Sequence, residues 1–316
     1  MAVARTLLTR HLSGAQAAAQ AGTLQRMHGE PHVWPRVWKI AGSGLEDEGN
    51  VRALKGWLAS SPTPGTLRCG VAASSHPDEL LVVATEALAD LDPVPIRVQP
   101  GSAVDFRARL LVPAKDCALV VRAPSGAVGK SPMACERGVV NAQVPIGQPG
   151  EYMIQLVVNV EGGPRPALEA SVFAGVEPRW EPAGGVWTNG QGVSGVLDRL
   201  NELRKNAGVG ALVRSGALDR VAQAHAERAL ASHMVAHDAG DGPPEGRLAR
   251  AGIDVVSGAE NVAQASSLAG AQLALEKSPS HFSVMVKPAY DAVGFGTATD
   301  ESGNVYLVEL FAAMAR

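Results

Sequence analysis

The chain of 316 residues has little of what usually assigns a sequence to a functional class. Aromatic residues make up only 4% of it. No run of about 18 apolar residues exists, so we expect no membrane-spanning helix. With 28 basic and 31 acidic residues, the net charge of -3 is too balanced for a nucleic-acid-binding surface. Nucleophile elbow, Walker loop, dinucleotide fingerprint, Cys-x-x-Cys and zincin motifs are all missing, so none of the enzyme classes that these motifs mark is indicated.

Cysteine is scarce, and the three residues present allow two interpretations. Cys117 and Cys135 can join neighbouring strands of one domain while Cys69 stays unpaired, or all three can be buried free thiols. The N-terminus offers no signal-peptide core, because Thr9 and Arg10 interrupt its short apolar start. We therefore expect either that the protein is cytoplasmic or that a leader is missing from this chain.

The length and the changes in composition predict several domains. Residues 1–92 are predicted to form a small α/β region, with a helix favoured over the Ala-rich residues 15–20. Residues 93–176 are predicted to form an all-β, immunoglobulin-like sandwich, because short Val-rich runs alternate with Pro, Gly and Ser. Residues 177–189 contain two prolines and a glycine pair, which is typical of a linker. Residues 190–316 complete the chain as an α+β domain.

The C-terminal domain shows the clearest periodicity. An apolar helical stripe begins at Val193, a second helix begins after Ser215 as a suitable N-cap, and a third covers residues 268–276. The chain ends in a predicted hairpin of residues 293–299 and 305–312. This order of helices and terminal strands predicts the α+β class.

A weak internal similarity links the two ends of the chain. Residues 57–72 resemble residues 275–296, and a strand-like segment follows each of them. Pro64 stands where the second stretch has His281. Residues 1–92 are therefore either a shortened, degenerate copy of the C-terminal domain or similar to it by chance.

An ordered set of short motifs identifies a family resemblance. The motifs are residues 200–204 (Leu-Asn-Glu-Leu-Arg), 222–226 (Ala-Gln-Ala-His-Ala), 236–238 (Ala-His-Asp), 246–247 (Gly-Arg), 260–261 (Glu-Asn) and 278–281 (Ser-Pro-Ser-His). Together they resemble the bacterial SCP-domain branch of the CAP superfamily, which comprises cysteine-rich secretory proteins, antigen 5 and pathogenesis-related proteins. The resemblance covers about residues 190–313 and implies a three-layer α-β-α sandwich.

The resemblance also implies a cleft lined by two histidines and one or two acidic residues. It would place His237, Glu260 and His281 in that cleft. Glu309 is preferred over Glu276 for a fourth position, because bacterial relatives often carry a glutamine in the final strand. Glu260 and Glu309 are thus the candidate catalytic carboxylates, and His237 and His281 are the candidate metal ligands.

The residue types agree with this grouping on chemical grounds. Two neutral imidazoles can hold a divalent cation such as zinc, and a nearby carboxylate can orient one of them. Catalytic zinc sites normally use three protein ligands, so two histidines predict modest metal affinity and do not by themselves imply a hydrolytic role. Glu309 is the only charged residue of an apolar strand, and a buried carboxylate there needs a partner.

Each candidate also has a simpler interpretation. His237 can be a loop histidine, His281 a solvated residue of a first helical turn, and Glu260 a cap for backbone N–H groups. A His233–His237 metal pair lacks the zincin glutamate, because Met follows His233. His225 is expected to face the core of its helix, and a serine-histidine arrangement at His281 rests on sequence adjacency alone.

We interpret the protein as a non-catalytic binding module, in which a bacterial CAP domain follows a β-sandwich. The resemblance implies a secreted or cell-envelope setting and an envelope, lipid or host-protein ligand, with a weakly held zinc or other divalent cation as the only expected cofactor. One alternative is a metal-dependent hydrolase of peptide or ester bonds that uses the same cleft. The other is a structural or adhesion protein that binds through the β-sandwich.

Overall fold

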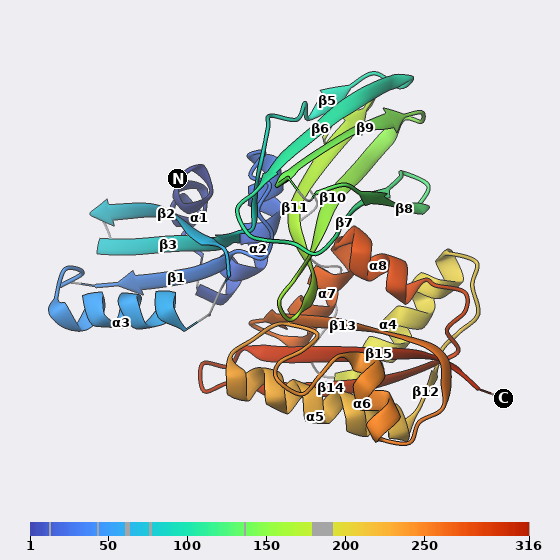
Figure 1. Cartoon of the computed structure of the whole chain (residues 1–316). Coiled ribbons are helices and arrows are strands. Elements are labelled where there is room, and N and C mark those ends of the chain that lie inside the picture. Colours follow the sequence, from blue (N-terminus) through green and yellow to red (C-terminus); the bar gives the residue numbers. More distant parts are fainter. Residues whose placement is uncertain are drawn as a thin grey trace. The chain divides into compact units, whose positions relative to one another are not determined.

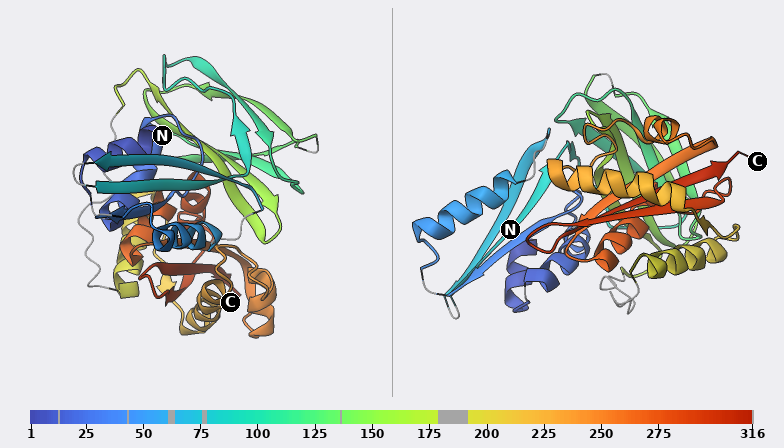
Figure 2. Two further views of the ribbon diagram at one scale, coloured as in Figure 1. Left: turned by 90° about the vertical axis from the view of Figure 1, so that its left-hand side faces the viewer. Right: turned by 90° about the horizontal axis from the view of Figure 1, so that it is seen from below.

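The computed structural model describes residues 1–12, 14–42, 44–60, 64–75, 78–135, 137–178 and 192–315. The chain divides into two compact units, each treated by itself below (Figures 1 and 2). The first unit comprises Met1–Val160 and Arg165–Ala183, and the second comprises Glu161–Pro164 and Gly184–Arg316. The α+β class predicted from the sequence is confirmed. Most of the predicted linker, residues 177–189, lies outside the described residues.

The first unit begins with a small region of helices and strands. Its elements are α1 (Ala2–Thr9), α2 (Gly14–Met27), β1 (Arg36–Ala41), α3 (Glu48–Ala59), β2 (Thr66–Ser75) and β3 (Asp78–Ala87). The strands form an antiparallel sheet in the order β1-β3-β2. Leu81 and Val83 of β3 pack with α1 and α2 in one apolar cluster. On the other face, the Arg36 guanidinium donates hydrogen bonds to the carbonyl oxygens of Trp57 and Leu58 and so holds the end of α3.

The same unit continues as a sandwich of two sheets. Its strands are β4 (Ala89–Leu91), β5 (Arg97–Val98), β6 (Ser102–Leu110), β7 (Cys117–Arg122), β8 (Val128–Met133), β9 (Val139–Ile146), β10 (Gly150–Val160) and β11 (Gly163–Ala174). The sheets have the orders β5-β11-β10-β7-β8 and β4-β6-β9 and share one core. Every second residue of β6 faces this core, as the alternation of its sequence requires. Cys117 and Cys135 form a disulfide, and Cys69 is an exposed free thiol.

The second unit contains the C-terminal domain. Its elements are α4 (Gly192–Asn206), β12 (Val213–Arg214), α5 (Gly216–Ser232), α6 (Pro244–Arg250), β13 (Val255–Ala265), α7 (Leu268–Lys277), α8 (Pro279–Met285), β14 (Ala292–Thr299) and β15 (Val305–Met314). The sheet order is β12-β14-β15-β13. Helices α4, α7 and α8 cover one face and α5 and α6 the other (Figure 1), which makes a three-layer α-β-α sandwich.

Local sequence explains where these elements lie. Ser215 caps α5 by accepting a hydrogen bond from the Leu218 amide, as predicted. Helix α5 packs directly on β14 at Gly294, which has no side chain. A Cβ atom added there would be only 2.2 Å from the Leu218 carbonyl carbon. The buried Arg204 of α4 donates to the Met285 carbonyl at 2.7 Å and so fixes the end of α8. Neither α6 nor β13 was predicted, and both position the site described next.

Candidate functional site

The first component of the site is a histidine-carboxylate pair at the edge strand β13. His237 lies in the loop between α5 and α6, and Glu260 lies in the middle of β13. The His237 Nδ1 atom is 3.1 Å from Glu260 Oε1. The Glu260 side chain is fully buried, whereas the His237 side chain is 20% exposed. The structure therefore brings together two of the four residues singled out in the sequence.

Two further side chains, which the sequence analysis did not assign to the site, contact Glu260. Arg247 of α6 donates from Nη2 to Glu260 Oε2 at 2.7 Å and to the His237 carbonyl at 3.1 Å. His225 of α5 places Nε2 at 3.6 Å from Glu260 Oε1 and at 3.0 Å from the Ala236 carbonyl. Its Nδ1 atom lies 2.8 Å from Asp241 Oδ2. The buried carboxylate is thus in contact with one guanidinium group and two imidazole rings.

The loop that carries His237 is held by its own hydrogen bonds. Asp238 Oδ1 accepts from the amides of Gly240 at 2.8 Å and Gly242 at 3.0 Å. These bonds lower the pKa of the Asp238 carboxyl. Helix α5 ends at Ser232, and the exposed His233 has a left-handed backbone conformation with φ of 54°. His233 and His237 are therefore not neighbours on one helix, and His225 is a core residue as expected.

The second candidate histidine, His281, lies in the first turn of α8. Its Nδ1 atom is 2.7 Å from Ser278 Oγ. Burial, with a smaller contribution from the charge of His237, lowers the pKa of His281 to about 3. The imidazole of His281 is therefore neutral at ordinary pH, and the two histidines interact electrostatically.

Glu309 lies on the opposite face of the sheet from Glu260. Side chains alternate along a strand, and Asn261, the residue next to Glu260, is the cross-strand partner of Glu309. Asn261 Nδ2 donates to Glu309 Oε2 at 2.9 Å and to the carbonyl of His281 at 3.3 Å. Burial raises the pKa of Glu309 to about 8. The alternative fourth residue, Glu276 of α7, is bound by Arg199, whose Nη2 donates to Glu276 Oε2 at 2.9 Å.

The donor set bears on metal binding. The hydrogen bond between His237 Nδ1 and Glu260 resembles the carboxylate-histidine pairs that orient metal ligands. Among the described residues, however, no group of three or more His, Cys, Asp or Glu side chains could hold a metal ion. The side chains present therefore do not fit a complete catalytic or structural zinc site.

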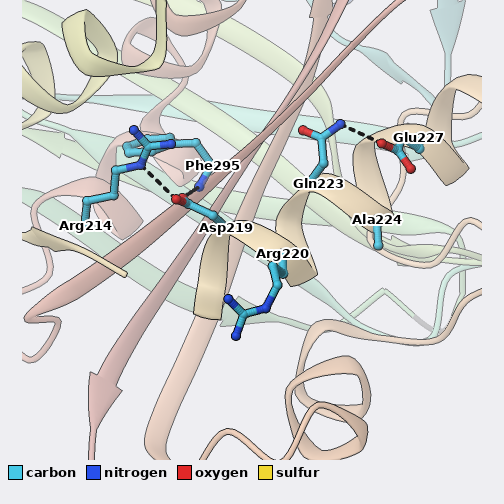
Figure 3. Close-up of a pocket in the computed structure, with 7 residues that line it drawn as sticks. All are labelled: Arg214, Asp219, Arg220, Gln223, Ala224, Glu227 and Phe295. Atoms are coloured by element: carbon cyan, nitrogen blue, oxygen red, sulfur yellow. Dashed lines mark hydrogen bonds and ion pairs between the residues drawn. The ribbon is translucent and has the colours of Figure 1, made fainter. Parts of the chain in front are cut away.

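A shallow open groove of about 420 Å³ lies beside α5, at the β14 side of the sheet (Figure 3). The Phe295 amide donates to Asp219 Oδ1 at 2.8 Å. Gln223, one helical turn further along α5, accepts from the Thr297 amide at 2.9 Å and donates to the Thr297 carbonyl at 3.0 Å. These two side chains bond to the outer edge of β14 beyond the two residues paired with β12. Arg214 adds an ion pair to Asp219 at 2.9 Å. At the groove, side chains of α5 therefore occupy the backbone hydrogen-bonding groups of the outer edge of β14.

The described helices include none that combines the length and apolarity needed to cross a membrane. This finding agrees with the sequence, which contains no long apolar run.

The C-terminal part of the chain is a three-layer α-β-α domain. It carries a histidine-carboxylate pair at an edge strand and a second histidine on helix α8. Residues 197–311 match the family model described as CAP, the Cysteine-rich secretory protein family. This part of the chain is a CAP domain of that family, and the predicted resemblance is confirmed.

Several solved structures are similar to this chain. An outer surface protein from Borrelia burgdorferi is 20% identical, with coverage of 42% of this chain and 99% of its own and a TM-score of 0.38. An extracellular protein containing a SCP domain from Bacillus anthracis is 14% identical over 71% of this chain and 88% of its own, with a TM-score of 0.36. A cysteine-rich secretory protein from Staphylococcus aureus is 14% identical over 71% and 86%, with a TM-score of 0.33. No curated protein matches.

Proposed function

We propose that the CAP domain is a non-catalytic binding module that acts outside the cytoplasm on an envelope, lipid or protein ligand. The observation that carries this proposal is that the carboxylate of Glu260 is buried and fully engaged in contacts within the protein. Both of its carboxylate oxygens accept hydrogen bonds or ion pairs, from His237 and Arg247, and its side chain is fully buried. A general base must reach the proton that it abstracts, and Glu260 is engaged within the protein.

The second candidate base is no better placed. Glu309 is fully buried on the other face of the sheet, and its raised pKa favours the protonated form, which cannot accept a proton. A hydrolase that used His237 and His281 with either carboxylate would therefore need a large rearrangement. Binding without catalysis needs none.

A divalent cation is part of the proposal only as a weakly held ligand. The bond to Glu260 orients the His237 ring through Nδ1, which makes Nε2 its ligand nitrogen. His281 is in the neutral form that ligates metals. Two imidazoles leave the rest of the coordination shell to solvent or ligand, so we derive no reaction step from such an ion.

The disulfide supports the proposed location. Cys117 and Cys135 are buried in the core of the β-sandwich and bonded to each other. Structural disulfides persist in oxidising compartments and are rare in the cytosol of most organisms. A thiol titration of the purified, denatured chain checks this, with one free thiol, Cys69, expected before reduction and three after it. Three thiols before reduction would contradict the proposed location.

Calorimetric zinc titration of the full chain tests the cleft. We expect binding weaker than roughly micromolar, lost in His237→Ala and in His281→Ala. His233→Asn is the matched control, because it removes an exposed histidine from the same segment and Asn tolerates a left-handed backbone. No binding by the wild type would remove the cation from the proposal. Peptide or ester hydrolysis that Glu260→Gln abolishes would overturn the non-catalytic assignment.

A further inference from the structure

Three buried glutamates of the C-terminal domain differ in their partners. Arg247 pairs with Glu260 at 2.7 Å, and Arg199 pairs with Glu276 at 2.9 Å. Glu309, with 0% exposure, has no ion pair with any described residue. An isolated buried carboxylate is strongly unfavourable, and such groups normally become neutral instead.

The surroundings of Glu309 are rich in hydrogen-bond acceptors. Asn261 Nδ2 donates to Glu309 Oε2, and Gln272 Nε2 donates to Glu276 Oε1 at 3.4 Å. Three buried oxygens then lack a donor within the described chain: Glu309 Oε1, Asn261 Oδ1 and Gln272 Oε1. Leaving buried acceptors without donors is costly, so we expect the cluster to contain at least one additional proton that can donate a hydrogen bond.

We propose that Glu309 is a neutral carboxylic acid at physiological pH and that its Oε1–H donates to the side-chain carbonyl of Asn261 or Gln272. One proton then gives two of the three oxygens a partner and removes the buried charge. The environment agrees with this assignment. The pKa of Glu309 is raised to about 8, because burial and the charge of Glu276 raise it by more than hydrogen bonds from Asn261 and Gln272 lower it.

The proton is coupled to the helix that carries His281. Asn261 uses its two amide hydrogens for Glu309 and for the carbonyl of His281, so one side chain joins the acid to α8. The ionisable group that acts on Glu309 is Glu276 of α7, which is paired with Arg199 of α4. When Glu309 releases its proton to solvent, the carboxylate is stable only where water reaches it. Ionisation therefore favours local opening of the cover formed by α7 and α8.

Infrared spectroscopy of the full chain tests the protonation directly. We expect a carboxylic acid C=O band at about pH 6 that disappears with a midpoint near pH 8. Glu309→Gln, an isostere whose amide can donate to the same carbonyl groups, should lack this band. Glu276→Gln removes a buried carboxylate that is already paired with Arg199 and should keep it. A wild type without the band at about pH 6, or a band that survives in Glu309→Gln, overturns the proposal.

Hydrogen exchange tests the coupling to α8. After correction for intrinsic exchange, the opening of α8 in the wild type should increase about tenfold per pH unit between about pH 6 and pH 8 and level off above. Glu309→Gln should show no such increase. Equal pH dependence in the two proteins would sink the coupling. This inference does not depend on what the domain binds.

Discussion

The sheet at the N-terminal end of the chain and the CAP sheet share one arrangement. The strand orders β1-β3-β2 and β13-β15-β14 correspond, all pairs are antiparallel, and helices precede the first strand and separate it from the second in both. A glycine lies where a helix approaches the second strand in each. A Cβ added to Gly70 would be 2.8 Å from the backbone nitrogen of Met1, the N-cap residue of α1, and Gly294 approaches α5 still more closely. That residues 1–92 are a degenerate CAP copy stays a prediction.

The two sheets differ in what they bury. With Gly70 placed opposite Gly294, the cross-strand pair Trp38 and Val82 corresponds to the pair Asn261 and Glu309. The same arrangement of strands therefore forms with an apolar pair at these positions. Both sheets bury polar side chains, and in the N-terminal sheet Glu79 of β3 pairs with Lys39 of β1 at 2.8 Å. At the position compared here only the CAP sheet is polar, and because buried polar groups cost stability unless they are fully paired, function explains this difference better than folding does.

The variant with the largest expected effect on stability removes the partner of a buried charge. Arg247→Met leaves Glu260 buried without its cation and should lower the free energy of unfolding of the C-terminal unit by about 3–5 kcal/mol. Arg165→Met is the counterpart in the first unit, where Arg165 pairs with Glu86 at 2.8 Å but the side chains are 16% and 19% exposed. We expect a loss of about 1 kcal/mol there. Urea unfolding with hydrogen exchange of peptides from each unit measures both.

A double variant controls for packing. Arg247→Met combined with Glu260→Met should recover much of the loss, because no unpaired charge is left. Equal losses of unfolding free energy for Arg247→Met and Arg165→Met, or no recovery in the double variant, would contradict the prediction that an unpaired buried Glu260 is the main cause of the loss.

The two glycines give the next largest difference. Gly294→Ala forces a Cβ to within 2.2 Å of the backbone of α5 and should cost about 3 kcal/mol. Gly70→Ala meets the backbone nitrogen of Met1 at the longer distance of 2.8 Å and should cost about 1 kcal/mol. Denaturant midpoints of the two variants decide between these values. If Gly70→Ala proves as damaging, α1 is fixed as firmly as α5.

Two buried groups, His281 and Glu309, make the stability of the CAP domain depend on pH. Stability rises with pH wherever the unfolded chain binds more protons than the folded one. The pKa of His281 is lowered from 6.5 to about 3, so its contribution to the free energy of unfolding rises with pH between about pH 3 and 6.5. The pKa of Glu309 is raised from 4.5 to about 8, so its contribution falls with pH between pH 4.5 and about 8. The two slopes cancel between pH 4.5 and 6.5. Above that, Glu309 alone should lower the free energy of unfolding by about 2 kcal/mol up to pH 8.

Variants separate these two contributions. Glu309→Gln should abolish the fall above pH 6.5 and leave the rise caused by His281 at lower pH. The N-terminal sheet, with Val82 at the corresponding position, should show neither slope. Metal-free urea titrations at several pH values measure this, and a wild type whose stability is flat from pH 6.5 to 8 would contradict the raised pKa of Glu309.

Sequence patterns predicted the elements that local physics determines. Apolar periodicity located α4, α5, α7 and the terminal hairpin, and Ser215 marked a helix start. Strand β13 was missed because Val255–Ala265 consists largely of small residues and becomes a strand through its pairing with β15. The role of Arg247 was missed because α6 has only seven residues and acts through a contact across the fold. The separation of Glu260 from Glu309 depends on register, which no single strand reveals.

The smallest predicted effect concerns the sheet edges. Gln223 bonds to both backbone groups of Thr297 and so covers the outer edge of β14, whereas no described strand pairs with the outer edge of β2. Gln223→Ala makes β14 resemble β2 and should cost about 1 kcal/mol, with faster exchange of the Thr297 amide. Gln143→Ala, which loses one exposed hydrogen bond to Asp105, should cost less than about 0.5 kcal/mol. Unchanged protection at Thr297 would mean that the CAP sheet does not need this cover, and that the two sheets differ in their buried polar groups rather than in their edges.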